Sequence, residues 1–167
     1  PKHGGANIKV CEMFDNIKEH VPSFDKGKLK DYVAKIVDRE AYDHTGLVYG
    51  MGHAVYSLSD PRADILKGFA EKLAVEKHME KEYEMRGYVA QAAAEIIAEK
   101  RRIYKGVAPN VDFYSGFVYD MLDLPRELYT PFFAVSRIAG WSAHRMEEIT
   151  NGGKIIRPGY QAVAPRQ

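Results

Sequence analysis

The chain has 167 residues, a formal net charge of +1 at pH 7, 46% hydrophobic residues and 28% charged residues, which is ordinary for one globular domain with a real core. Its lysines and arginines form no block interleaved with aromatic residues, so neither nucleic-acid binding nor an anionic membrane surface is supported. No apolar stretch reaches membrane-spanning length. The single cysteine, Cys11, excludes an internal disulfide and a Cys-x-x-Cys metal site, and it fits a reducing, cytoplasmic compartment.

Apolar residues at helical spacing dominate the beginning of the chain. They predict a helix over residues 6–20, in which Cys11 is a small buried apolar residue. A second helix should follow a cap at Ser23 or Asp25.

Residues 40–60 are rich in Gly, Asp and Tyr and are predicted to form a loop. A third helix should start where Asp60 can act as the cap and Pro61 as the first helical residue. Its predicted core stripe consists of Ile65, Leu66, Phe69 and Leu73.

The second half of the chain continues with helical patterns. A long one covers residues 80–104, and Gly87 is a possible break within it. Residues 107–114 are predicted to form a loop, residues 115–122 a helix, and Pro125 starts a short helical turn.

The most apolar helix is predicted from Thr130 to about Ile149, and because nearly every face is apolar we expect it to be buried. Residues 154–167 have no helical period and should form an extended tail. Strand-like alternation is nearly absent, apart from a possible short pair between residues 48–49 and 154–156. The predicted fold class is therefore all-α.

A histidine stands among glycines in Gly50-Met51-Gly52-His53, where backbone can approach whatever the imidazole touches. Arg62 follows just past a proline. A histidine and an arginine on one tight loop suit a ligand that carries a carboxylate and a carbonyl. Taken alone, a loop histidine is more often structural, and that alternative stays open.

A second histidine, in His3-Gly4-Gly5, stands at the mouth of the first predicted helix. The positive end of the helix dipole disfavours imidazolium there, and neutral imidazole can donate a hydrogen bond to a carbonyl oxygen that becomes an enolate. The alternative is a disordered terminal histidine. No His-x3-His pair is present, and no metal site is expected.

Asp112 lies among aromatic residues and suits either a helix cap or a general base with a raised pKa. Arg137 interrupts the most apolar helix, where a charge needs a partner: a structural carboxylate or an anionic substrate. Arg157, in the tail, would ordinarily be a solvated charge.

Taken together, these motifs closely resemble the citrate synthase family, in the family's order and over nearly the whole chain. The motifs are His3-Gly4-Gly5-Ala6-Asn7, Gly50-Met51-Gly52-His53-Ala54-Val55-Tyr56, Asp60-Pro61-Arg62, Asn110-Val111-Asp112-Phe113-Tyr114-Ser115-Gly116, Ser136-Arg137-Ile138-Ala139-Gly140 and Arg157-Pro158.

The resemblance implies an all-helical homodimer whose subunits have a large and a small domain. It assigns residues 1–22 to the end of a large-domain portion, residues 23–130 to the small domain, and residues 131–167 to a buried helix and extended tail of the large domain. We therefore expect the chain to be the carboxy-terminal part of a longer protein, without which it could be inactive.

The implied reaction, a step of the tricarboxylic acid cycle, joins acetyl-CoA to oxaloacetate and then hydrolyses citryl-CoA. By resemblance, Asp112 removes a methyl proton from acetyl-CoA, His3 stabilises the resulting enol, and His53 hydrogen-bonds and protonates the oxaloacetate carbonyl. No permanently bound cofactor is implied, since acetyl-CoA is a co-substrate.

The resemblance also implies the binding residues. Arg62 and Arg137 clamp the oxaloacetate carboxylates, Arg157 reaches into the partner subunit's site, and the backbone around Met51 and Gly52 contacts CoA. Two alternatives stay open: a 2-methylcitrate synthase that uses propionyl-CoA, and a non-catalytic helical module that binds acidic metabolites or a partner protein.

Overall fold

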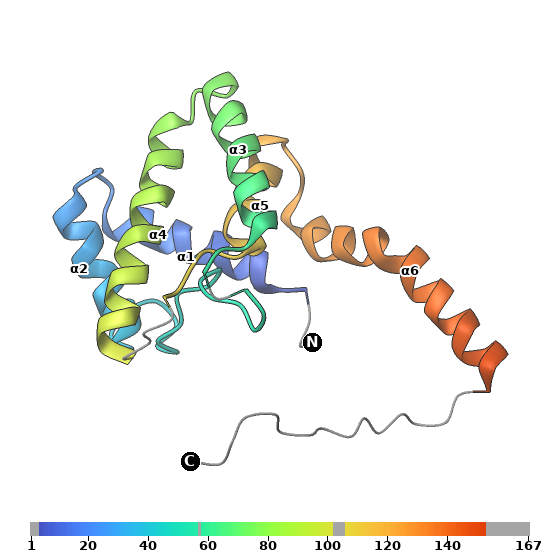
Figure 1. The fold of residues 1–167 in the computed structure, drawn as a ribbon. Helices are drawn as coiled ribbons and strands as arrows, with labels where there is room; N and C mark the ends of the chain where they lie inside the picture. The colour runs from blue at the N-terminus through green and yellow to red at the C-terminus, as the bar shows by residue number, and fades with distance from the viewer. Residues whose placement is uncertain (1–3, 57, 102–105, 153–167) are drawn as a thin grey trace, which may run out of the picture. The chain divides into compact units, whose positions relative to one another are not determined.

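The computed structural model describes residues 4–56, 58–101 and 106–152, and these residues form helices and no β-strand. The helices are α1 (Ala6–His20), α2 (Lys26–Val37), α3 (Pro61–Glu76), α4 (Glu80–Arg101), α5 (Val111–Met121) and α6 (Tyr129–Asn151), with a 3-10 turn, η1 (Arg126–Leu128), before α6 (Figure 1). The all-α prediction is confirmed.

Side-chain caps fix where three of the helices begin. Asp25 accepts from Lys28 N at α2, which settles the choice of cap there, and Asp60 accepts from Arg62 N at α3. Asn110 accepts from Asp112 N, so α5 begins at Val111 and the loop predicted up to residue 114 was wrong.

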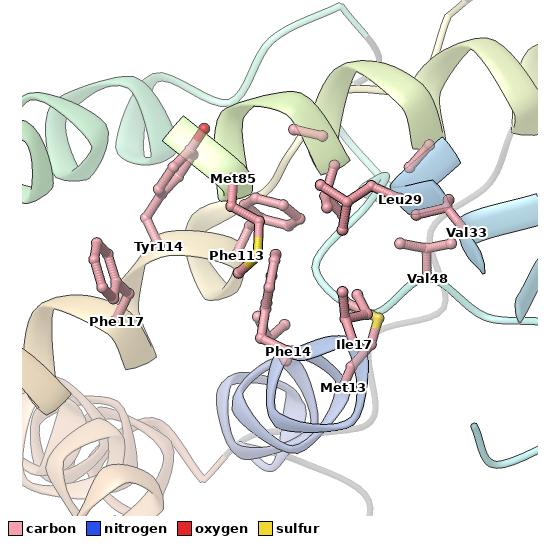
Figure 2. Close-up of a cluster of buried hydrophobic side chains, with 14 of the residues drawn as sticks. Met13, Phe14, Ile17, Leu29, Val33, Val48, Met85, Phe113, Tyr114 and Phe117 are labelled. Carbon is pink, nitrogen blue, oxygen red and sulfur yellow. The ribbon is translucent and has the colours of Figure 1, made fainter. Parts of the chain in front are cut away.

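The chain divides into two compact units at Phe132/Phe133. In the first unit, α5 packs against α1 and α3, while α4 packs against α2 and α3. Their buried apolar side chains form one core, to which the loop before α3 adds Val48. Figure 2 shows part of this core, with Phe14 and Met13 of α1 below Phe113 of α5 and Leu29 of α2 beside them.

Gly116 lets α1 and α5 approach each other closely. A Cβ at this position would lie 2.3 Å from Cys11 Sγ and 3.1 Å from the carbonyl oxygen of Asn7. Cys11 is buried, as predicted, and desolvation raises the pKa of its thiol to about 11. It is a packing residue in this contact.

Two predictions about α3 and α4 were wrong or only half right. Gly87 does not break α4, because one glycine costs only about 1 kcal/mol in a helix that is held by its buried face. On α3 the predicted stripe is half confirmed: Leu66 and Leu73 are partly buried and pack against the core, whereas Ile65 and Phe69 are 64% and 56% exposed. The fully buried residues of α3 are Ala63, Ala70 and Ala74, small residues that let the helix lie close to its neighbours.

The second unit is described only by the part of α6 that follows Phe132. Its large apolar side chains, from Val135 to Ile149, are 46% to 68% exposed, so the expected burial is not found among the described residues. A single helix cannot bury its own apolar face. The tail and its possible strand pairing lie outside the described residues, and the division into residues 1–22, 23–130 and 131–167 stays a prediction.

None of the helices in the described part of the chain combines the length and apolar character needed to cross a membrane.

Candidate functional site

The loop before α3 is tied directly to the amino-terminal end of α5. Gly52 N donates to Ala108 O and Asn110 N donates to Gly50 O, both at 2.8 Å. Asn110 also donates from Nδ2 to Gly52 O at 2.7 Å, while its Oδ1 caps α5. One asparagine side chain therefore fixes the loop and the start of the helix together.

Gly50 is required at this junction by both backbone conformation and space. Its φ is +81°, and a Cβ would lie 2.9 Å from Phe113 Cα and 2.9 Å from Val10 Cγ2. The next residue, Met51, is half-buried and forms an isolated antiparallel bridge with Pro109. The glycine-rich sequence thus presses the loop onto α1 and α5.

Asp60 connects three parts of the site. Its carboxylate is 2% exposed and accepts from Arg62 Nε at 2.9 Å, Arg62 Nη2 at 2.8 Å, Arg62 N at 3.0 Å and Val111 N at 3.2 Å. The hydrogen bond from the Arg62 side chain, opposed by burial and aided by the backbone donors, lowers the pKa of Asp60. Asp60 therefore stays ionised while it holds Arg62 and the first residue of α5.

Arg62 is a fixed cation with an accessible side. The hydrogen bond to Asp60 raises its pKa although desolvation opposes this, and the charges of Asp60, Tyr56 and Asp112 act in the same direction as the hydrogen bond. Its guanidinium lies 5.2 Å from the centroid of the Tyr56 ring, and its side chain is 42% exposed. This is an anion-binding group whose orientation is set in advance.

His53 is exposed and its tautomer follows from the backbone around it. Nδ1 accepts from Val55 N at 3.0 Å and from Tyr56 N at 3.2 Å. A neutral imidazole that accepts at Nδ1 carries its proton on Nε2. Nε2 lies 3.2 Å from Arg62 Nη2, which can only donate. Two donors therefore converge, and an oxygen atom of a ligand would satisfy both.

Asp112 is half-buried in the first turn of α5. Its backbone N–H donates to Asn110 Oδ1 at 2.9 Å, and the helix terminus favours a negative charge at this position. It directly follows Val111, the residue bound to Asp60. The structure thus joins His53, Arg62 and Asp112 through short connections. This site can bind an oxyanion beside a carboxylate that is able to accept a proton.

For three of the predicted site residues, His3, Arg137 and Arg157, the structure gives no position relative to this cluster. His3 and Arg157 lie outside the described residues. Arg137 belongs to the second unit, where its guanidinium lies 4.6 Å from the centroid of the Phe133 ring. The structure therefore gives Arg137 an aromatic partner on its own helix, and its proposed ligand contact stays a prediction.

Sequence analysis missed the roles of three residues that organise the cluster. Asp60 was assigned only as a cap, and no role was given to Asn110 or Tyr56. The sequence did contain a signal for Asp60 and Asn110, because each stands directly before a helix that carries a candidate site residue. Among the described residues, no group of three or more His, Cys, Asp or Glu side chains is placed to hold a metal ion.

The fold and the site define an all-α protein with a histidine–arginine donor pair and a carboxylate held next to it by helix caps. Comparison with known proteins agrees with this class. The family model described as "Citrate synthase, C-terminal domain" matches residues 1–159. The chain belongs to the citrate synthase family.

Individual relatives are similar over nearly the whole chain. The citrate synthase of Synechocystis sp. is 39% identical over 158 residues, 95% of this chain and 36% of that protein. The 2-methylcitrate synthase of Shewanella oneidensis is 33% identical over 169 residues, 100% of this chain and 40% of that protein.

A solved structure shares the fold. The citrate synthase of Thermoplasma acidophilum, in a ternary complex with carboxymethyl coenzyme A and oxaloacetate, aligns with a TM-score of 0.71 and 33% identity, covering 100% of this chain and 41% of that one. The chain thus spans well under half the length of these relatives.

Proposed function

We propose that this chain carries catalytic and binding residues of a citrate synthase, which condenses acetyl-CoA with oxaloacetate to citryl-CoA and hydrolyses it to citrate and CoA. The observation that carries the proposal is that His53 Nε2 lies 3.2 Å from Arg62 Nη2 while His53 Nδ1 accepts from the Val55 and Tyr56 amides, an arrangement from which we infer that both nitrogens present donors to a ligand. Two further findings support the proposal. Asp60, which holds Arg62, also binds Val111 in the turn that carries Asp112, and two of the relatives named above are citrate synthases.

Oxaloacetate is the substrate that suits the donor pair. The Nε2–H of His53 points to its carbonyl oxygen, and the guanidinium of Arg62 binds a neighbouring carboxylate. Arg137 and, from the other subunit, Arg157 would bind the rest of the substrate's negative charge. Because Asp60 holds Arg62 from behind, little side-chain freedom is lost when oxaloacetate binds.

Asp112 is the proposed base. It takes a proton from the methyl group of acetyl-CoA, while His3 donates a hydrogen bond to the thioester oxygen that becomes enolic. The methyl carbon then attacks the carbonyl carbon of oxaloacetate, and the new alkoxide takes the proton of His53 Nε2. Water subsequently cleaves the thioester and releases CoA.

CoA would contact the loop by packing against backbone at Met51 and Gly52. The N–H and the C=O of Gly52 are engaged with Ala108 and Asn110, so this contact would rest on the bare surface that a glycine offers. No permanently bound cofactor is needed for this chemistry, in which acetyl-CoA is consumed as a co-substrate.

The complete activity is proposed for a polypeptide of the relatives' length. An amino-terminal part, a homodimer and a cytoplasmic location belong to this proposal, and the 167-residue chain by itself is expected to be inactive. The exposed apolar face of α6 supports the need for further protein around it.

The test is the release of free CoA thiol from acetyl-CoA and oxaloacetate by the protein extended to the relatives' length. We expect turnover that Asp112→Asn abolishes with the fold intact. The matched control is Asp64→Asn, which changes an exposed aspartate in the first turn of α3 and should retain the wild-type rate.

Two results would contradict parts of the proposal. Absence of thiol release by the extended wild-type protein would refute the activity, and a near-wild-type rate for Asp112→Asn would refute the base. Faster turnover with propionyl-CoA than with acetyl-CoA would assign 2-methylcitrate synthesis instead.

A further inference from the structure

Arg86 of α4 is a buried cation between two aromatic rings. It is 2% exposed, and its guanidinium carbon lies 4.0 Å from the centroid of the Phe14 ring and 4.3 Å from that of Phe117. Phe14 belongs to α1 and Phe117 to α5. One side chain from α4 therefore contacts both helices at their crossing, through cation–π stacking.

Arg86 is a costly residue in this position. Its Nε and Nη1 atoms are buried and have no hydrogen-bond partner among the described residues. Desolvation lowers its pKa, while the nearby acidic groups Glu82, Asp120 and Asp15 oppose that change. An apolar side chain of similar volume would fill the space without the cost of desolvating a charge. Space filling alone therefore does not explain an arginine here.

A continuous path of ring contacts leads from Arg86 to the proposed base. The Phe14 ring that Arg86 covers meets the Phe113 ring edge to face, with centroids 5.5 Å apart and an interplanar angle of 82°. Figure 2 shows Phe14 reaching from α1 toward Phe113. Phe113 is fully buried and directly follows Asp112 in the first turn of α5. A shift of Phe14 would thus be transmitted to that turn.

The donor pair is held by different contacts. Asp60 fixes Arg62, and backbone donors fix His53; within the described part of the chain these contacts involve neither Arg86 nor Phe14. Asp60 also binds Val111 N in the turn of Asp112, whereas the Arg86–Phe14–Phe113 path reaches that turn through the core. Loss of Arg86 should therefore disturb the placement of the base and leave the contacts that hold the donor pair.

We propose that Arg86 is a positioning residue for proton abstraction: its stacking on Phe14 and Phe117 fixes α5 against α1 and thereby sets where the Asp112 carboxylate lies. The inference rests on the proposed function, since it assigns a task to the turn that carries Asp112. It predicts that loss of Arg86 impairs kcat selectively.

The test is Arg86→Met in the extended protein, because methionine keeps most of the volume and removes the charge and the planar group. We expect an unchanged or higher Tm, a kcat reduced at least tenfold, and a KM for oxaloacetate within twofold of wild type. Arg86→Lys, which keeps the charge but not the planar stack, should fall between the two. The control is Arg39→Met at an exposed arginine, with no change expected.

Amide hydrogen exchange gives a second readout that does not depend on activity. In the 167-residue chain, Arg86→Met should accelerate exchange at Asp112 and Phe113 at least tenfold while the amides of α2 keep their rates. The exchange result does not depend on turnover. Absence of turnover in the wild-type extended protein would refute the proposed function and leave the exchange result valid.

A folded Arg86→Met protein with kcat within twofold of wild type, or with unchanged exchange at Asp112, would overturn the proposal. A lower Tm together with losses of similar fold in kcat and in oxaloacetate affinity would also overturn the proposal, because this pattern would indicate a purely structural role. If Arg86→Met does not fold, the same criteria apply to Arg86→Lys.

Discussion

Two helices of nearly equal length, α4 and α6, use their apolar residues in opposite ways. α4 buries one face, including Val89, Ala93 and Ile97, against the first unit's core. In α6 the only buried residue is Tyr129, at its start, while large side chains such as Ile138 and Met146 are exposed. The first helix is stabilised by packing within this chain, whereas the second displays an apolar surface of the kind that other protein normally covers.

The same contrast holds for the predicted site residues that lie in the two units. The loop around His53, the Asp60–Arg62 pair and the start of α5 are joined by hydrogen bonds within the first unit. For Arg137, on α6, the contact found among the described residues is with the Phe133 ring of its own helix. The arrangement of the first-unit residues should therefore depend less on further protein than that of Arg137.

The largest expected difference in stability is between the same substitution, isoleucine to alanine, made in α4 and in α6. Ile97→Ala should lower the free energy of unfolding of the 167-residue chain by about 2–4 kcal/mol, because it leaves a cavity in a packed core. Ile138→Ala should change it by less than about 0.5 kcal/mol, because that side chain is already exposed. Urea unfolding followed by circular dichroism measures both, and equal losses would erase the contrast.

Substitution of a glycine by alanine should change the stability by an intermediate amount, with opposite signs in the two units. Gly116→Ala should destabilise the chain by about 1–3 kcal/mol, since its Cβ would collide with Cys11 Sγ. Gly140→Ala in α6 has nothing within 4 Å of the added Cβ and should raise helix stability by up to about 1 kcal/mol. Thermal unfolding and helical content measure the pair. Destabilisation by Gly140→Ala would indicate that α6 is packed within this chain.

The smallest expected effect is the loss of stability of the first unit as the pH falls. Hydrogen bonding to Arg62 lowers the pKa of Asp60, and the Arg126 interaction outweighs desolvation to lower that of Asp15. A carboxyl whose folded-state pKa is lowered contributes stability above its unfolded pKa of about 3.9 and loses it as the pH falls further. The free energy of unfolding should therefore be nearly constant from about pH 7 to 5 and decline below about pH 4.

The acid response has its own control. Asp60→Asn should make the decline shallower, whereas Asp64→Asn, at an exposed position, should leave its slope unchanged. Stability that increases toward pH 3, or identical profiles for both variants, would contradict the assigned cause.

Most helices were predictable because their start signals are local. Asp25 and Asp60 cap their helices as their positions in the sequence suggest. The start of α5 was missed because Asn110 looks like a loop residue until its helix is known. The buried face of α3 was predicted only in part, through Leu66 and Leu73, because alanines carry little apolar weight although they allow the closest packing.

For the site, the sequence pattern singled out His53, Arg62 and Asp112, but it could not show how they are connected. The bond between Asp60 and Val111 joins residues 51 positions apart, and the tautomer of His53 depends on the backbone fold of its own loop. Such contacts exist only once the chain has folded. The buried position of Arg86 was likewise hidden in a segment that reads as a polar helix.

The most direct test of the site is a calorimetric titration of oxaloacetate into the extended protein and two of its variants. The arrangement predicts that Arg62→Met weakens binding at least tenfold, while Asp112→Asn binds oxaloacetate as tightly as wild type and produces no citrate. Wild-type affinity in Arg62→Met, or equal loss of binding in both variants, would contradict the division of the site into a binding pair and a base.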